Sequence, residues 1–145
     1  MARGKSAQVK SVEKRIFAGK RKTAVAKVRV RHGTGKVYFN YLPAEELQTF
    51  HRLALAEPIE IYKAEMGSNP EFDFYVFASG GGKESQIEAA RLAIARAIVE
   101  LTGSQVLHRV YFEYDKHMVV PDSRRKEARK PNDSKARAKR QKSYR

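Results

Sequence analysis

Small apolar residues and cations alternate from residue 24 to residue 31. A period of two is typical of a β-strand that buries one side and exposes the other. The apolar side holds alanines and valines and the polar side holds cations: Ala24, Ala26, Val28 and Val30 against Lys27, Arg29 and Arg31. The pattern therefore predicts a strand with a basic outer side.

Four more segments predict strands or the turn between two of them. Residues 32–35 contain two glycines, which permit the positive φ angles of a hairpin loop. Residues 36–41 then predict a returning strand, with Tyr41 on its apolar side. Residues 72–78 predict a strand with large side chains on both sides, and residues 107–114 predict another in which apolar and polar residues alternate. We expect these strands to form one sheet.

A first helix is predicted between the second and third of these strands. Proline suits the first position of a helix, so the helix should begin at Pro43, where Glu45 and Glu46 also suit its positive end. We expect Pro58 to end this helix, because proline interrupts helical hydrogen bonding. Residues 59–62 would then form a short extended piece.

A second helix follows a run of glycines. Apolar residues recur every three or four positions along residues 87–101, and Gly103 ends the pattern. The segment Gly80-Gly81-Gly82-Lys83 has the place of a phosphate-binding loop, between a strand and a helix. The P-loop pattern, however, needs a glycine where Phe77 stands and a serine or threonine where Glu84 stands. We interpret the glycines as a tight turn, with a backbone contact to a phosphate as the alternative.

Charge divides the chain into three parts. Residues 1–22 carry a net charge of +7, residues 23–120 carry −1, and residues 121–145 carry +8. Met118 to Val120 would close the core, and no large aliphatic side chain follows Pro121. We therefore expect a basic N-terminal arm at 1–15, an α/β core domain at 16–120 and a basic C-terminal tail at 121–145.

The two basic ends favour nucleic acid as the partner. Segments of this charge density repel themselves and become compact only against a polyanion. Binding to nucleic acid also releases counterions from the phosphates. A membrane is disfavoured because the tail has no large apolar residue to insert. We expect the tail to contact phosphates rather than to read bases. The basic side of the first strand could add to this surface, although an ordinary solvated side explains it equally well.

Catalytic and metal-binding constellations are not found in the sequence. The chain has no cysteine, and its four histidines lack metal-ligand spacing. We expect no cofactor, no metal and no enzymatic activity. Asp115 and Asp122 are interpreted as turn or ion-pair partners of the cations beside them, Lys116, Arg124 and Arg125.

Three stretches together resemble one family, the small-subunit ribosomal protein called S-nine in bacteria and S-sixteen in eukaryotes. GKRKTAVAKVRVRHGTGKVYFN at 19–40 is similar to its opening hairpin, and GGGKESQIEAARLAIARAIVEL at 80–101 to its glycine turn and helix. The tail, with DSRRKEARKP and then SKARAKRQKSYR, is similar to its C-terminus. The QKSYR ending is typical of archaeal or eukaryotic members rather than bacterial ones.

The resemblance implies an α+β fold: a mainly antiparallel sheet packed with two main helices, a left-handed βαβ crossover, and basic disordered extensions at both ends. It also implies a structural role in the head of the small ribosomal subunit, beside neighbouring head proteins. The ribosome would be cytoplasmic, with transient nucleolar assembly in a eukaryotic cell.

Charge and resemblance together give the candidate binding residues. Ribosomal RNA would be bound by Lys20, Arg21, Lys22, Lys27, Arg29, Lys83, Arg124, Arg125, Lys126, Arg129, Lys130, Lys135, Arg137, Lys139 and Arg140. The resemblance places the last residues near the transfer RNA in the peptidyl site: Lys142, Ser143, Tyr144 and Arg145. Two alternatives stay open, a generic RNA-binding or histone-like protein outside the ribosome and a small phosphotransferase.

Overall fold

The computed structural model describes residues 15–131, 135–138 and 143. Most of the expected N-terminal arm, residues 1–14, lies outside these residues. In chain order the elements are β1 (Ile16–Arg21), β2 (Ala24–His32), β3 (Val37–Phe39), β4 (Leu42–Pro43), the 3-10 turn η1 (Ala44–Glu46), α2 (Thr49–Met66), β5 (Phe72–Ser79), α3 (Lys83–Thr102), α4 (Gln105–Tyr114) and the 3-10 turn η2 (Lys116–Met118).

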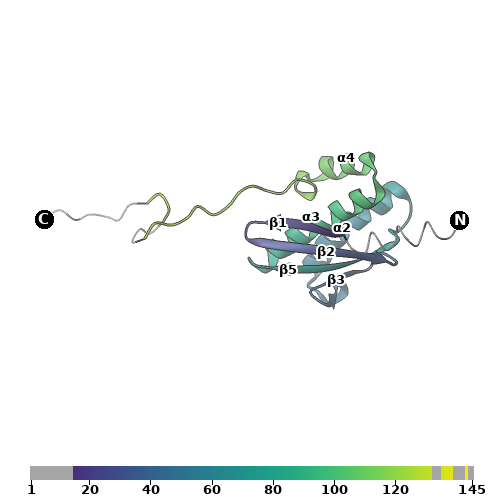
Figure 1. Ribbon diagram of the computed structural model, residues 1–145, viewed down its shortest axis with the longest axis horizontal. Coiled ribbons are helices and arrows are strands. Elements are labelled where there is room, and N and C mark those ends of the chain that lie inside the picture. Colours follow the sequence, from purple (N-terminus) through teal and green to yellow (C-terminus); the bar gives the residue numbers. More distant parts are fainter. Residues whose placement is uncertain (1–14, 132–134, 139–142, 144–145) are drawn as a thin grey trace.

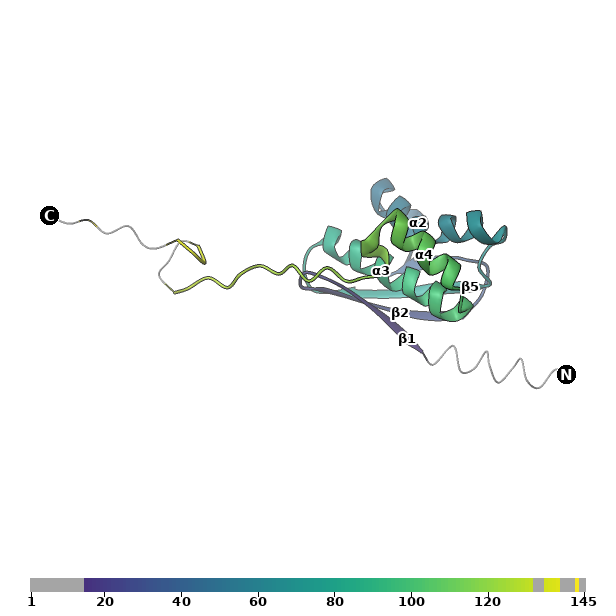
Figure 2. The same ribbon diagram turned by 90° about the horizontal axis from the view of Figure 1, so that it is seen from above.

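The strands form one mixed sheet in the order β1-β2-β5-β3-β4. β1 with β2, β2 with β5 and β3 with β4 are antiparallel, whereas β3 and β5 are parallel. The helices α2, α3 and α4 gather on one side of this sheet (Figures 1 and 2). The predicted α+β class with a mainly antiparallel sheet is therefore confirmed. The chain passes from β3 to the parallel β5 through α2, and the left hand of that crossover stays a prediction.

The core lies between the sheet and α3. On β2 the predicted alternation is confirmed, because Ala24, Ala26, Val28 and Val30 are fully buried while the cations between them are exposed. Gly19 lets β1 approach α3 closely. A Cβ atom there would collide with the carbonyl oxygen of Ala89 and lie 2.9 Å from the backbone nitrogen of Ala93. The glycine is thus required by the packing of β1 on α3.

The prediction that the first helix begins at Pro43 and ends at Pro58 is wrong. Pro43 precedes only the single turn η1, and α2 begins at Thr49 and continues through Pro58 to Met66. A proline costs a helix one backbone hydrogen bond, but the Pro58 ring is fully buried and its carbonyl accepts a 2.6 Å hydrogen bond from the Tyr111 hydroxyl. Packing therefore outweighs the local preference, and residues 59–62 are helical rather than extended.

The predicted strand at 107–114 is also wrong, because the segment forms the helix α4. Leu107 and Tyr111 are buried and lie four residues apart, which is a helical spacing as well as an alternating one. The Ser104 hydroxyl oxygen caps this helix by accepting a 3.3 Å hydrogen bond from the Leu107 N–H. The described residues therefore hold three α-helices instead of the two main helices expected.

The strand predicted to return beside β2 is shorter than expected and does not pair with β2, because β5 lies between them. β3 ends at Phe39, and Asn40 and Tyr41 take positive φ angles of 47° and 72°. This turn carries Tyr41 out of the core, where its side chain is 85% exposed. The prediction that Tyr41 lies on the buried side is wrong, because the strand ends before the alternation reaches it.

Candidate nucleic-acid interface

The start of the tail is bonded to the turn between β1 and β2. Arg21, the last residue of β1, forms ion pairs with Asp122 and, at 2.5 Å, with Glu88 of α3. Arg124 pairs with the same Asp122 at 2.8 Å. One carboxylate therefore links cations from the two basic ends of the chain.

Asp122 also fixes the backbone that follows it. Its Oδ1 accepts a 2.8 Å hydrogen bond from the Arg124 N–H, and its carbonyl oxygen accepts one of 3.0 Å from Arg125 Nη1. The residue is only 8% exposed. Because a buried carboxylate needs such partners to stay charged, Asp122 belongs to the ordered structure although it lies in the predicted tail. The expected pairing of Asp122 with Arg124 is confirmed, whereas Arg125 bonds to the Asp122 backbone carbonyl rather than to its carboxylate.

Cations from both ends gather around this carboxylate. An open hollow of about 550 Å³ is lined by Arg21, Lys22, Thr23, Asp122, Arg124, Arg125 and Lys126. The hollow, here called the basic junction, holds five cations and one acid. Guanidinium groups fixed in this way suit bidentate contacts with phosphate oxygens.

Two arginines of α3 tie the preceding segment to the core. Arg96 donates a 3.0 Å hydrogen bond to the Val119 carbonyl and one of 3.3 Å to the Ala18 carbonyl of β1. Arg91 pairs with Glu57 of α2 at 2.5 Å and with Asp115 at 2.6 Å. Asp115 therefore pairs with Arg91 rather than with the Lys116 expected from the sequence. The tail leaves the core from a segment that is held at several points.

The pKa of the Asp115 carboxyl lies below its ordinary value of 3.8. Burial opposes its ionisation, but hydrogen bonds from the His117 N–H and from Arg91 outweigh that effect and favour the charged form. The His117 N–H bond, at 2.8 Å, also caps η2. Asp115 thus both caps η2 and forms an ion pair with Arg91.

Beyond η2 the described chain has no helix or strand and leads away from the core (Figures 1 and 2). The tail cations are exposed along the described part: Arg124, Arg125, Lys126, Arg129, Lys130, Lys135 and Arg137. Arg137 pairs with Glu127 at 3.0 Å, and Ser143 is exposed. The remaining predicted residues lie outside the described residues: Lys139, Arg140, Lys142, Tyr144 and Arg145.

Three of the other predicted cations lie on the side of the sheet that faces away from the helices. Lys20 of β1 and Lys27 and Arg29 of β2 are exposed there. Lys83 is exposed at the first turn of α3. The structure therefore does not bring all the predicted residues to the basic junction.

The glycine run forms the strand-to-helix turn that was predicted. Gly80 and Gly81 have positive φ angles of 76° and 63°, and Gly82 caps α3. The side chain of Gln86 donates a 3.0 Å hydrogen bond to the Gly80 carbonyl and closes the turn. This link was not predicted, because it depends on how the helix folds back on the turn.

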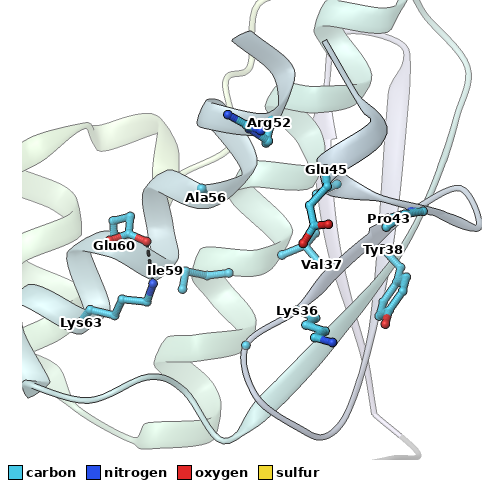
Figure 3. Close-up of a pocket in the computed structure, with 12 residues that line it drawn as sticks. Lys36, Val37, Tyr38, Pro43, Glu45, Arg52, Ala56, Ile59, Glu60 and Lys63 are labelled. Atoms are coloured by element: carbon cyan, nitrogen blue, oxygen red, sulfur yellow. Dashed lines mark hydrogen bonds and ion pairs between the residues drawn. The ribbon is translucent and has the colours of Figure 1, made fainter. Parts of the chain in front are cut away.

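A second hollow, of about 290 Å³, lies between β3 and α2 (Figure 3). Its lining mixes cations with acids, and Lys63 is paired with Glu60 at 2.6 Å. It holds no catalytic arrangement of side chains. In the described part of the chain no group of three His, Asp or Glu residues is placed to hold a metal ion. None of the described helices is long and apolar enough to cross a membrane.

Comparison with known proteins gives the family. The family described as "Ribosomal protein S9/S16" matches residues 19–145. The chain belongs to this ribosomal protein family. It is a family of non-enzymatic ribosomal proteins.

Several archaeal relatives cover nearly the whole chain. The small ribosomal subunit protein uS9 of Methanococcus vannielii is 40% identical over 130 residues, which is 88% of this chain and 95% of the relative. The protein of the same name from Methanothrix thermoacetophila is 41% identical over 129 residues, 88% of this chain and 96% of the relative. That of Methanococcus maripaludis C7 is 42% identical over 130 residues. The predicted family and its archaeal or eukaryotic type are confirmed.

Proposed function

We propose that this chain is a structural constituent of the small ribosomal subunit that binds ribosomal RNA in the subunit head. The observation that carries the proposal is the basic junction, where Arg21 and Lys22 meet the first cations of the tail around Asp122. The relatives' names support the assignment to the small subunit. Neighbouring head proteins are further partners, and the working location is the cytoplasmic ribosome.

The folded core acts as a rigid base from which the tail extends. Residues 121–145 carry a net charge of +8, so ribosomal phosphates supply the counter-charge that lets the tail become compact. The junction fixes the direction in which the tail leaves, which reduces the entropy lost when it binds. Its phosphate contacts would come from Arg124, Arg125, Lys126, Arg129, Lys130, Lys135, Arg137, Lys139 and Arg140.

The tail end reaches toward the transfer RNA in the peptidyl site. Lys142, Ser143, Tyr144 and Arg145 supply that contact. The guanidinium group of Arg145 makes it, because its planar fork matches a phosphate. These tail residues therefore stabilise bound transfer RNA through charge and shape and do not catalyse a reaction.

Sedimentation tests the assignment to the subunit. A native lysate is fractionated on a sucrose gradient in high salt and probed for the chain. A protein held only by six to ten phosphate contacts loses roughly 10³- to 10⁵-fold in affinity between 50 and 200 mM salt and is stripped. The chain should stay with the small subunit. Recovery at the top of the gradient would favour the generic RNA-binding protein instead.

Deletion of Arg145 tests the tail end. Subunits carrying the shortened chain should assemble normally but retain peptidyl-site transfer RNA less well, by about tenfold for one lost charge-assisted contact. Filter binding of labelled transfer RNA measures the change. Arg109→Ala is the matched control, because Arg109 is an exposed cation on α4. Loss of the whole subunit, or unchanged retention, would contradict this role.

A further inference from the structure

The side of the sheet opposite the helices is uncovered among the described residues (Figure 1). We call it the open face. It carries cations on β2 and aromatic rings on β3 and β5, with one more ring after β3: Lys27, Arg29, Arg31, Tyr38, Tyr75, Phe77 and Tyr41.

The rings of the open face form two ordered groups. Tyr38 and Tyr75, on the parallel strands β3 and β5, are stacked with centroids 4.9 Å apart and planes 8° apart. The Arg31 guanidinium carbon lies 5.2 Å from the centre of the Tyr75 ring. Figure 3 shows the ring of Tyr38 turned away from α2, whereas Val37 points toward it. Tyr38 and Tyr75 therefore present an ordered stack on the open face.

Tyr41 forms the second group with Phe77. The two rings meet edge to face with centroids 5.1 Å apart. Phe77 faces Lys27 across the β2–β5 pairing, so a cation flanks this group. Tyr41 is nevertheless 85% exposed. A large ring that is held by one neighbour and otherwise left in solvent offers a surface for stacking.

The charges of the open face select an anionic partner. Lys27, Arg29 and Arg31 line one margin of the rings, along a single strand. Asp73 lies opposite Arg31, but its Oδ1 accepts hydrogen bonds of 2.8 and 2.9 Å from the N–H groups of Thr34 and Lys36. That carboxylate oxygen is already hydrogen-bonded to the backbone of the turn between β2 and β3. Three cations therefore stand against one carboxylate, and the margin beside the rings has a net positive charge.

We propose that the open face binds an unpaired stretch of RNA, with one base stacked on Tyr41 and the adjoining phosphates held by Lys27 and Arg29. The hydroxyl groups of Tyr38 and Tyr75 supply hydrogen bonds to base edges or ribose. Aromatic rings beside cations on a bare sheet are the arrangement that recognises single-stranded RNA. That the RNA is ribosomal rests on the function proposed above.

An acidic protein surface would bind the cations of the open face but would not stack on its rings. The test must therefore distinguish binding through bases from binding through phosphates alone. The full-length chain is titrated with a single-stranded RNA hexamer and with an abasic hexamer that has the same phosphates. Salt near 0.3 M reduces the contribution of the tail. Tyrosine-ring NMR signals report the site, with buried Tyr111 as an internal reference. A hexaglutamate peptide serves as the protein-like anion.

The variants are Tyr41→Ala, Tyr41→Phe and Phe50→Ala. Phe50 is the matched control, because it is 86% exposed and lies on α2. The intact hexamer should shift the Tyr41 ring signals, and the abasic hexamer should not. Tyr41→Ala should weaken binding of the intact hexamer by at least about fivefold, the low end of the value of one stacked base. Tyr41→Phe and Phe50→Ala should bind like the parent chain.

Three results would overturn the proposal: equal affinity for the two hexamers, unchanged binding by Tyr41→Ala, or a hexaglutamate shift that matches that of the RNA. The first two would leave a phosphate-only surface, and the third a protein-docking face. The outcome is separate from the assignment to the small subunit, which the high-salt gradient tests on its own.

Discussion

Tyr111 of α4 is bonded to the middle of α2. The residue is fully buried, and its hydroxyl donates to the carbonyl of Pro58 in the middle of α2. Burial and the neighbouring Tyr62 raise the pKa of Tyr111 well above its ordinary value of 10.0. The phenol therefore stays protonated at neutral pH and remains a hydrogen-bond donor.

Replacement of Tyr111 by phenylalanine should lower the free energy of unfolding by about 1 kcal/mol, the usual net value of one neutral hydrogen bond. The ring and its packing are kept, so the fold should not change. Urea unfolding followed by circular dichroism measures the difference. A change below about 0.3 kcal/mol would show that the Pro58 carbonyl does not depend on this bond.

Asp115 gives the molecule an acid-sensitive contact. Its folded pKa lies below the ordinary value of 3.8, so its charged form stabilises the fold. That contribution is fully present above about pH 4 and is lost as the pH falls through the folded pKa. Asp115→Asn keeps an acceptor for the His117 N–H but removes the charge that faces Arg91.

The Asp115→Asn variant should lose about 1 kcal/mol at pH 7 and should depend less on pH below pH 4 than the parent chain. Unfolding free energies measured from pH 2.5 to 7 give both values. Parallel curves for the two proteins below pH 4 would show that Asp115 does not carry the acid sensitivity.

At the level of elements, the close approach of β1 to α3 depends on Gly19. Any side chain there meets the backbone of Ala89 and Ala93, and backbone cannot turn aside as a side chain can. Gly19→Ala should therefore destabilise the protein by about 2–3 kcal/mol, as overpacking does. Gly82→Ala is the control, because nothing lies within 4 Å of its added Cβ and its φ of −112° suits any residue.

Thermal unfolding of the two glycine variants checks the packing of β1. The Gly82→Ala variant loses at most about 1 kcal/mol, from the altered helix cap. If both variants have the same melting temperature, β1 can move away from α3 and the core is less tightly packed than its geometry indicates.

The elements also show where sequence patterns succeed and fail. The strands β2 and β5 and the helix α3 were predictable, because each is long and buries one clear set of residues. The helix α4 was not, because Leu107 and Tyr111 are four residues apart and fit both periods. The continuation of α2 through Pro58 depends on burial of the proline ring, which local sequence does not encode.

The sequence predicts which residues give the candidate site its charge, but it does not predict which of them come together in space. The basic tail and the cations of β2 follow directly from residue counts. The link between Arg21 and Asp122 joins residues 101 positions apart, which no local pattern reports. The open face was only partly predictable, because the strand at 72–78 was predicted with large side chains on both sides and Tyr41 was assigned to the core. The left-handed turn after Phe39 is what exposes it.

At the level of the whole molecule, the core should fold without the tail. Chains ending at residue 120 and at residue 122 should both unfold cooperatively, because the remaining residues contribute almost no apolar burial. The chain ending at 120 should be less stable by about 1–2 kcal/mol, since Arg21 then loses Asp122. Urea unfolding compares the two. A non-cooperative transition in either chain would show that the tail is part of the folding unit.

In the function that we propose, the core is anchored on ribosomal RNA and the tail extends to the peptidyl-site transfer RNA. The chain has no cysteine, so a single introduced thiol can carry an iron chelate that cleaves nearby RNA. Small subunits are reconstituted with Ser143→Cys, at the exposed end of the tail, or with the control Gln105→Cys, which is exposed on α4. A probe at 143 should cut the anticodon stem of bound transfer RNA, whereas a probe at 105 should leave it intact. An uncut anticodon stem with the probe at 143, in subunits that contain the chain, would show that the tail does not reach the transfer RNA.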